Sequence, residues 1–113
     1  QEMKERIFVK SVFNSQKNRE LYTKLCSEHA FVYPEQVMCS FIKKEDVQHL
    51  FTEPWHHGYF LTCRFDFVVC DWEGIPKFVV EYQGSLHTEK DQVKRDEFKK
   101  RIVEFTGIPV VYY

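Results

Sequence analysis

The stretch FLTCRFDFVVCDWEGIPKFVVEYQG, residues 60–84, decides the fold because it holds two strand-like runs on either side of a turn. The runs 60–71 and 77–84 are rich in Phe, Val and Tyr, which favour strands, and the pair Glu73–Gly74 between them suits a tight turn. Both runs are more apolar than a strand with one solvated face. The stretch therefore predicts a hairpin at the centre of a sheet that is covered on both faces.

Two acidic residues of this hairpin, Asp66 and Glu81, lie directly opposite each other if the turn is centred as described. Opposed residues of an antiparallel pair share one face, with Cβ atoms about 5 Å apart, and Gln83 lies on that face because side chains alternate. Buried like charges repel, and Mg²⁺ or Mn²⁺ would relieve the repulsion because these ions prefer oxygen ligands. Two alternatives remain: one carboxylate pairs with a lysine or arginine, or a bulge at Pro76 shifts the register.

The other elements follow from apolar periodicity and from turn residues. They are a helix from about 15 to 29, a strand near 36–42, a short helical turn and loop over 43–60, a long helix over roughly 88–106 and a last buried strand over 108–113. The order α-β-β-β-α-β predicts an α/β fold, a mixed sheet flanked by helices. The 113 residues suffice for one domain, 1–113, and the initial Gln suggests a domain cut from a longer protein.

The long helix carries an apolar stripe, Phe98, Ile102 and Phe105, which we expect to face the sheet. Toward the N-terminus the stripe becomes ionic, and Lys94 lies on the flank from which it would reach the two carboxylates. The predicted site thus contains two acids, an amide and a lysine.

The charge balance, 16 basic and 17 acidic residues, argues against a protein whose whole surface is basic for binding nucleic acid. Any nucleic-acid contact would need a local patch. The segment KRDEFKKR, residues 94–101, supplies five Lys and Arg for a phosphate backbone. A solvated helix face with pairs of opposite charge would have the same composition.

The four cysteines form no CxxC motif and lie among apolar residues, so we expect reduced thiols rather than a disulfide framework. No apolar run is long enough to span a membrane and no signal peptide is visible, which predicts a cytoplasmic protein without membrane contact. A zinc site at His56, His57 and a cysteine is a further alternative, which the adjacency of the two histidines disfavours.

The block RFDFVVCD…KFVVEYQGSLHTEKDQVKRDEFKKRIVEFTGIPVVYY resembles the conserved part of PD-(D/E)XK, or restriction-endonuclease-like, domains. It is similar above all to bacterial domains related to the very-short-patch-repair endonuclease. The similarity is strongest over about residues 60–113 and extends more weakly to SQKNRELYTKL and EQVMCSFI. It implies a restriction-endonuclease-like core.

The resemblance implies roles for residues at matching positions. Asp66 and Glu81 match the two metal-binding acids, with the carbonyl of Tyr82 as a further ligand of Mg²⁺ or Mn²⁺. Glu20, on the first helix, matches an acid that completes the metal site through water. Gln83 stands where the family expects a lysine that polarises the attacking water, and an amide does this less well.

Lys94, on the long helix, would supply the positive charge that Gln83 lacks. In related domains this lysine stands either on the strand or on the following helix. His87 would protonate the leaving oxygen, because imidazole titrates near neutral pH; alternatively it caps the turn before the helix. Contacts to the DNA backbone are expected from the basic residues of the helix: Lys94, Arg95, Lys99, Lys100 and Arg101.

These roles imply metal-dependent hydrolysis of phosphodiester bonds, an endonuclease-like activity with nucleic acid, above all DNA, as partner. The alternative is a nuclease-fold module that has lost catalysis and binds nucleic acid or protein. Gln83 and the near-neutral charge favour the module, whereas the presence of both Asp66 and Glu81 favours the enzyme.

Overall fold

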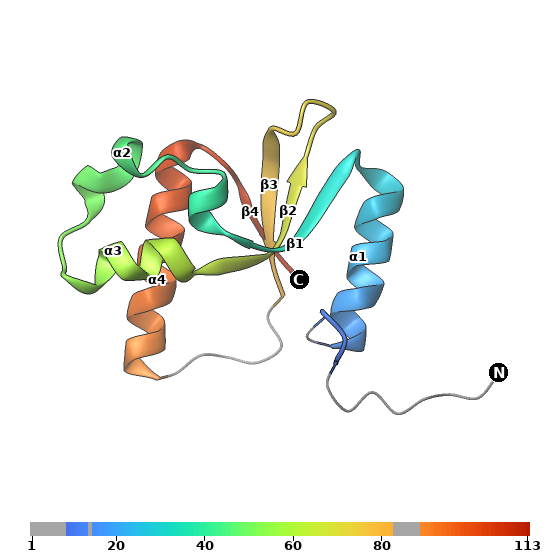
Figure 1. Cartoon of the computed structure of the whole chain (residues 1–113), viewed down its shortest axis with the longest axis horizontal. Helices are drawn as coiled ribbons and strands as arrows, with labels where there is room; N and C mark the ends of the chain where they lie inside the picture. Colours follow the sequence, from blue (N-terminus) through green and yellow to red (C-terminus); the bar gives the residue numbers. More distant parts are fainter. Residues whose placement is uncertain (1–8, 14, 83–88) are drawn as a thin grey trace.

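A four-stranded mixed sheet forms the centre of the protein in the computed structural model, which describes residues 9–13, 15–82 and 89–113. The strands are β1 (Phe31–Val37), β2 (Arg64–Cys70), β3 (Pro76–Glu81) and β4 (Val110–Tyr112), and they lie in the order β1-β2-β3-β4. β1 and β3 run antiparallel to β2, whereas β4 is parallel to β3. The predicted hairpin is therefore the central pair of the sheet (Figure 1).

The register of this hairpin agrees with the prediction along most of its length. Phe67 pairs with Val80 and Val68 with Val79, and extending this register by one residue brings Asp66 opposite Glu81. The bulge considered at Pro76 does exist: the register shifts at the turn end, where Cys70 pairs with Pro76. It therefore leaves the alignment of the two acids unchanged.

Helices cover both faces of the sheet (Figure 1). On one face α1 (Gln16–Glu28) buries Leu21 and Leu25 against Phe67 and Val80. On the other face pack the short helices η1 (Met38–Ser40), α2 (Lys44–Val47) and η2 (Gln48–Leu50), followed by α3 (Trp55–Thr62) and α4 (Lys90–Thr106). This second layer contains most of the buried core, and it faces the side of β3 that carries Val79 and Glu81.

The buried face of α4 differs from the predicted stripe. Phe98 and Ile102 are buried as expected, but the third member is Val103, which is fully buried, whereas Phe105 is 55% exposed. Successive residues are about 100° apart around a helix, so this exchange turns the buried face toward Lys99 and away from Lys94. Gly107 ends the helix in the left-handed conformation, with φ of 83°.

Three other predictions of elements need correction. The first strand is 31–37 rather than 36–42, because Pro34 is tolerated in β1, which is an edge strand. Residues 43–60, predicted to be a short helical turn and a loop, contain α2, η2 and most of α3. The last strand, β4, lies at the other edge and is only half-buried, with Tyr112 46% exposed.

No helix within the described residues has the length and apolar character that crossing a bilayer requires.

Candidate functional site

Glu81, at the end of β3, forms an ion pair with a lysine of α4. Its Oε2 lies 2.8 Å from Nζ of Lys99, and the side chain is 26% exposed. Lys99 is itself only 13% exposed; its ammonium also donates to the carbonyl oxygen of Arg64 and lies 4.3 Å from the ring centre of Phe65. The lysine thus bridges α4 to the ends of both central strands.

Burial raises the pKa of Glu81 above its ordinary value of 4.5, in spite of this lysine. The charge and the hydrogen bond of Lys99 lower the pKa, whereas the nearby negative charges of Asp66 and Asp96 raise it further. The surroundings of Glu81 therefore disfavour its ionised form, and burial is the main reason.

Asp66, on β2, is fixed by the backbone of the neighbouring strand. Its Oδ2 accepts a 2.6 Å hydrogen bond from the N–H of Tyr82, directly after Glu81. This bond and the strand register hold the two acids at the same end of the central hairpin. The predicted juxtaposition of Asp66 and Glu81 is thus consistent with the register and with the electrostatic influence of one acid on the other.

The donor set fits a hard divalent cation with few protein ligands. Mg²⁺ is commonly held by one or two carboxylates and keeps several waters, and two carboxylates are what the hairpin end offers. Within residues 9–13, 15–82 and 89–113 no group of three or more His, Cys, Asp or Glu is placed to hold a metal ion. The ammonium of Lys99 already supplies one positive charge to Glu81.

Three of the predicted site residues lie apart from this pair or outside the described chain. Glu20 is exposed on α1 and accepts a 2.9 Å hydrogen bond from Nε2 of Gln16; α1 packs on the face of the sheet opposite to α4. Its part in a metal site stays a prediction. Gln83 and His87 lie outside the described residues.

The five basic residues predicted to bind nucleic acid point in different directions from α4. Lys99 faces the sheet, and Lys100 lies 3.9 Å from Glu104. Lys94 and Arg95 line one cavity beside α3, and Lys94 and Arg101 line another. Their arrangement is therefore not a single patch.

Lys99, not Lys94, is the lysine that contacts the acid pair. The sequence contained a signal for it, since Lys99 is four residues before Val103 and so shares its face of the helix. The apolar spacing of Phe98, Ile102 and Phe105 predicts a different buried face, one that does not include Lys99.

The two histidines of the zinc alternative have other roles. His56 is buried and its Nδ1 accepts hydrogen bonds from the N–H groups of Thr52 (2.9 Å) and Glu53 (3.1 Å). His57 is exposed and packs edge-on against Phe51. All four cysteines are free thiols, as expected.

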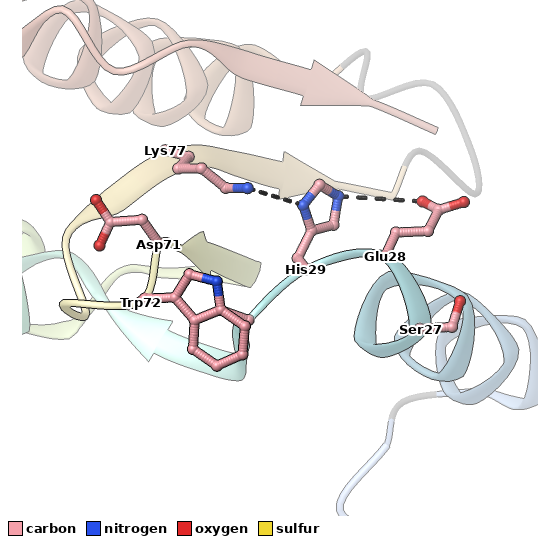
Figure 2. A pocket seen from close by; sticks show the side chains of 7 residues that line it. Ser27, Glu28, His29, Asp71, Trp72 and Lys77 are labelled. Atoms are coloured by element: carbon pink, nitrogen blue, oxygen red, sulfur yellow. Dashed lines mark hydrogen bonds and ion pairs between the residues drawn. The ribbon is translucent and has the colours of Figure 1, made fainter.

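A cavity of about 300 Å³ lies at the other end of the hairpin, next to the turn (Figure 2). There Nζ of Lys77 lies 3.0 Å from Nδ1 of His29, whose Nε2 is 4.0 Å from Glu28, and Trp72 is 82% exposed beside them. Lys77 is near the start of β3 and Glu81 is at its end, so this cavity is separate from the acid pair.

Comparison with known proteins gives one match. No curated protein and no solved structure matches the chain. A family model described as "Protein of unknown function (DUF2726)" matches residues 55–113, from α3 to the last residue. The match covers more than half of the chain and includes Asp66, Glu81 and Lys99, so the protein belongs to the DUF2726 family.

Proposed function

We propose that the protein is a divalent-metal-dependent phosphodiesterase of the endonuclease type, with DNA as its substrate. The observation that carries this proposal is the half-buried acid Glu81, which lies with Asp66 at the end of the central hairpin and is contacted by Lys99 of α4. Two carboxylates can hold a divalent ion that activates water, and a nearby ammonium can offset charge on a phosphate.

The fold supports the same proposal. The helix α1, the three antiparallel strands, the helix α4 and the parallel strand β4 follow one another in the order α-β-β-β-α-β, with short helices inserted before β2. We take this arrangement to be the restriction-endonuclease-like core implied by the sequence resemblance.

Each residue of the proposed site would have its own task. Asp66 and Glu81 would hold Mg²⁺ or Mn²⁺, together with the carbonyl of Tyr82, and Gln83 would orient the attacking water. The bound ion would lower the pKa of a water molecule and offset negative charge on the phosphate. Lys99 would stabilise charge on the scissile phosphate, because its long stem lets the ammonium move from Glu81 to a phosphate oxygen.

A second candidate function is a nuclease-fold module that binds nucleic acid without cleaving it. The contact of 2.8 Å between Lys99 and Glu81 favours this candidate, because the lysine already partly neutralises the acid without any metal. In that case the pair would be a structural ion pair, and a cation would have to compete with Lys99.

Cleavage of plasmid and single-stranded DNA in Mg²⁺ and in Mn²⁺ tests the proposal. We expect Glu81→Gln to abolish cleavage, because it removes a direct metal ligand. Lys99→Gln should lower the rate at saturating DNA by about 10²- to 10³-fold, as loss of a group that stabilises transition-state charge does. Lys100→Gln is the matched control on the same helix, because Lys100 is exposed and lies 3.9 Å from Glu104, and it should leave that rate near the wild-type value.

Two results would count against the enzyme. If the wild-type protein binds DNA but cuts it in neither metal, the binding module is the better description. If Glu81→Gln cuts as fast as the wild type, the activity does not arise at this site.

A further inference from the structure

A cavity of about 490 Å³ lies between α3 and α4. Its walls combine two aromatic rings, two basic side chains, a hydroxyl and an acid: Trp55, Tyr59, Thr62, Lys94, Arg95 and Asp91. This combination differs from the apolar core beneath it, and the site proposed above uses none of its residues.

Trp55 forms a wall of this cavity. It also lines a second cavity, of about 240 Å³, together with Lys94, so these two side chains separate the two spaces. The indole lies edge-on to Phe98 and Tyr59, with ring centres 5.6 and 5.8 Å away. It is still 37% exposed. Trp55 is thus a rigid aromatic surface that remains open to a ligand.

The charges that line the larger cavity suit an anion. Lys94 is exposed there, and Arg95 is oriented by Gln92, whose Oε1 is 2.8 Å from one of its terminal nitrogens. These two bases outnumber Asp91, the acid among the lining residues, while Glu89 lies 3.9 Å from Arg95 outside the lining. The smaller cavity has no such excess, because Glu53 and Glu97 line it together with Lys94 and Arg101.

Tyr59 places the cavity on the same side of the sheet as Glu81. It lines the cavity and packs against the core cluster that contains Phe98 and Val79, and Val79 lies on the side of β3 that also carries Glu81. Burial raises the pKa of Tyr59 to about 12. A ligand in the cavity would therefore lie on the same side of the sheet as the proposed catalytic acid.

We propose that this cavity receives one unstacked nucleobase on Trp55, with an adjoining phosphate against Lys94 and Arg95. The inference rests on the proposed function and narrows its substrate to single-stranded or locally unpaired nucleic acid. In a duplex both faces of a base are covered by its neighbours, so only an unstacked base can lie on the indole.

The test is a binding titration without divalent ions, so that no cleavage occurs. The chain has two tryptophans, and Trp72→Phe leaves Trp55 as the source of tryptophan fluorescence. A short single strand of thymidylate should quench this fluorescence. A strand of equal length with abasic sugars should bind more weakly and quench little, and a duplex of the same length should do likewise.

Variants extend the test to affinity. Trp55→Leu should weaken binding of the thymidylate strand by about tenfold, the usual effect of losing one stacked base. Trp72→Leu is the matched control. Trp72 is exposed in the turn between β2 and β3, and the acids Asp66 and Glu81 lie at the opposite end of this hairpin. If Trp55→Leu fails to fold, the exposed Lys94→Gln replaces it, with a severalfold loss of affinity and a weaker salt dependence.

Several results would overturn the inference: no binding by the wild type, equal quenching by the abasic strand, equal affinity for the duplex, or unchanged affinity in a folded Trp55→Leu protein. Failure of the proposed function has a different signature. If binding depends on Trp55 but Mn²⁺ brings about no cleavage, the cavity is a base-binding site in a protein that is not a nuclease. If duplex DNA is cut without any contribution from Trp55, only the inference about the cavity is wrong.

Discussion

The partly buried carboxylate of Glu81 should destabilise the folded protein when it is ionised. The free energy of unfolding should therefore depend on pH. Burial raises the folded-state pKa of Glu81 above 4.5. Between pH 4.5 and that raised pKa the folded state holds more protons than the unfolded state, so the contribution of Glu81 to stability declines as the pH rises. The free energy of unfolding of the wild type, measured against Glu81→Gln by urea denaturation, should therefore fall from pH 4 toward neutrality.

The opposite slope would be equally informative. If the free energy of unfolding of the wild type rises with pH relative to that of Glu81→Gln, the ion pair with Lys99 lowers the pKa of Glu81 overall. The acid would then be stabilised as an anion by the fold alone.

His56 should show the reverse dependence. Burial, followed by the positive charge of Arg101, lowers its pKa below 6.5, and its Nδ1 accepts hydrogen bonds from the backbone. The ring is also stacked on Phe98, with centres 4.0 Å apart. Because the unfolded state takes up the proton first, the contribution of His56 to stability is present above pH 6.5 and is lost as the pH falls toward the folded-state pKa.

An NMR titration of the ring protons checks this prediction directly. The pKa of His56 should lie below 6.5, and the melting temperature should decrease as the pH is lowered from 6.5. A pKa of 6.5 or more would show that the imidazole does not hold the N–H groups of Thr52 and Glu53 in the way described.

At the scale of elements, α4 decides which lysine reaches the site, and its orientation can be tested by stability. Val103 is fully buried, so Val103→Ala should lower the free energy of unfolding by about 1 to 3 kcal/mol, as removal of buried methyl groups does. Phe105→Ala removes a larger side chain from a position that is 55% exposed and should cost clearly less. Chemical denaturation of both variants gives the comparison.

A larger loss from Phe105→Ala than from Val103→Ala would mean that α4 is rotated toward the predicted stripe. Lys94 would then again be the candidate for the lysine at the acid pair.

The elements differ in how far the sequence alone could predict them. The hairpin was predictable because its register depends on a short turn and on local alternation, and the bulge lies at the turn end, away from Asp66 and Glu81. Strand β1 differs from its prediction because Pro34 disfavours a central strand but is tolerated at an edge, and only the order of the sheet reveals that β1 is at an edge.

For the whole molecule, the mixed α/β sheet, the central hairpin and the places of α1 and α4 in the order were correct predictions from the sequence, whereas α2 and α3 between β1 and β2 are additional to the predicted order. The site was predictable only in part. The alignment of the two acids depends only on the register of one hairpin. The contact of Lys99 with Glu81 depends instead on how α4 packs on the sheet, which the sequence does not fix. Apolar periodicity alone left two choices for the buried face, and burial of Val103 distinguishes them.

The central claim is that Asp66 and Glu81 together bind a divalent cation, and thermal unfolding in Mn²⁺ tests it most directly. A ligand that binds only the folded state stabilises it by about 2.7 kcal/mol at a hundred times its Kd. The melting temperature of the wild type should therefore rise by several degrees with Mn²⁺. Asp66→Asn should remove this rise, and Glu73→Gln, an exposed acid in the turn at the other end of the hairpin, should keep it. An unchanged melting temperature of the wild type, or an equal rise in Asp66→Asn, would contradict the account.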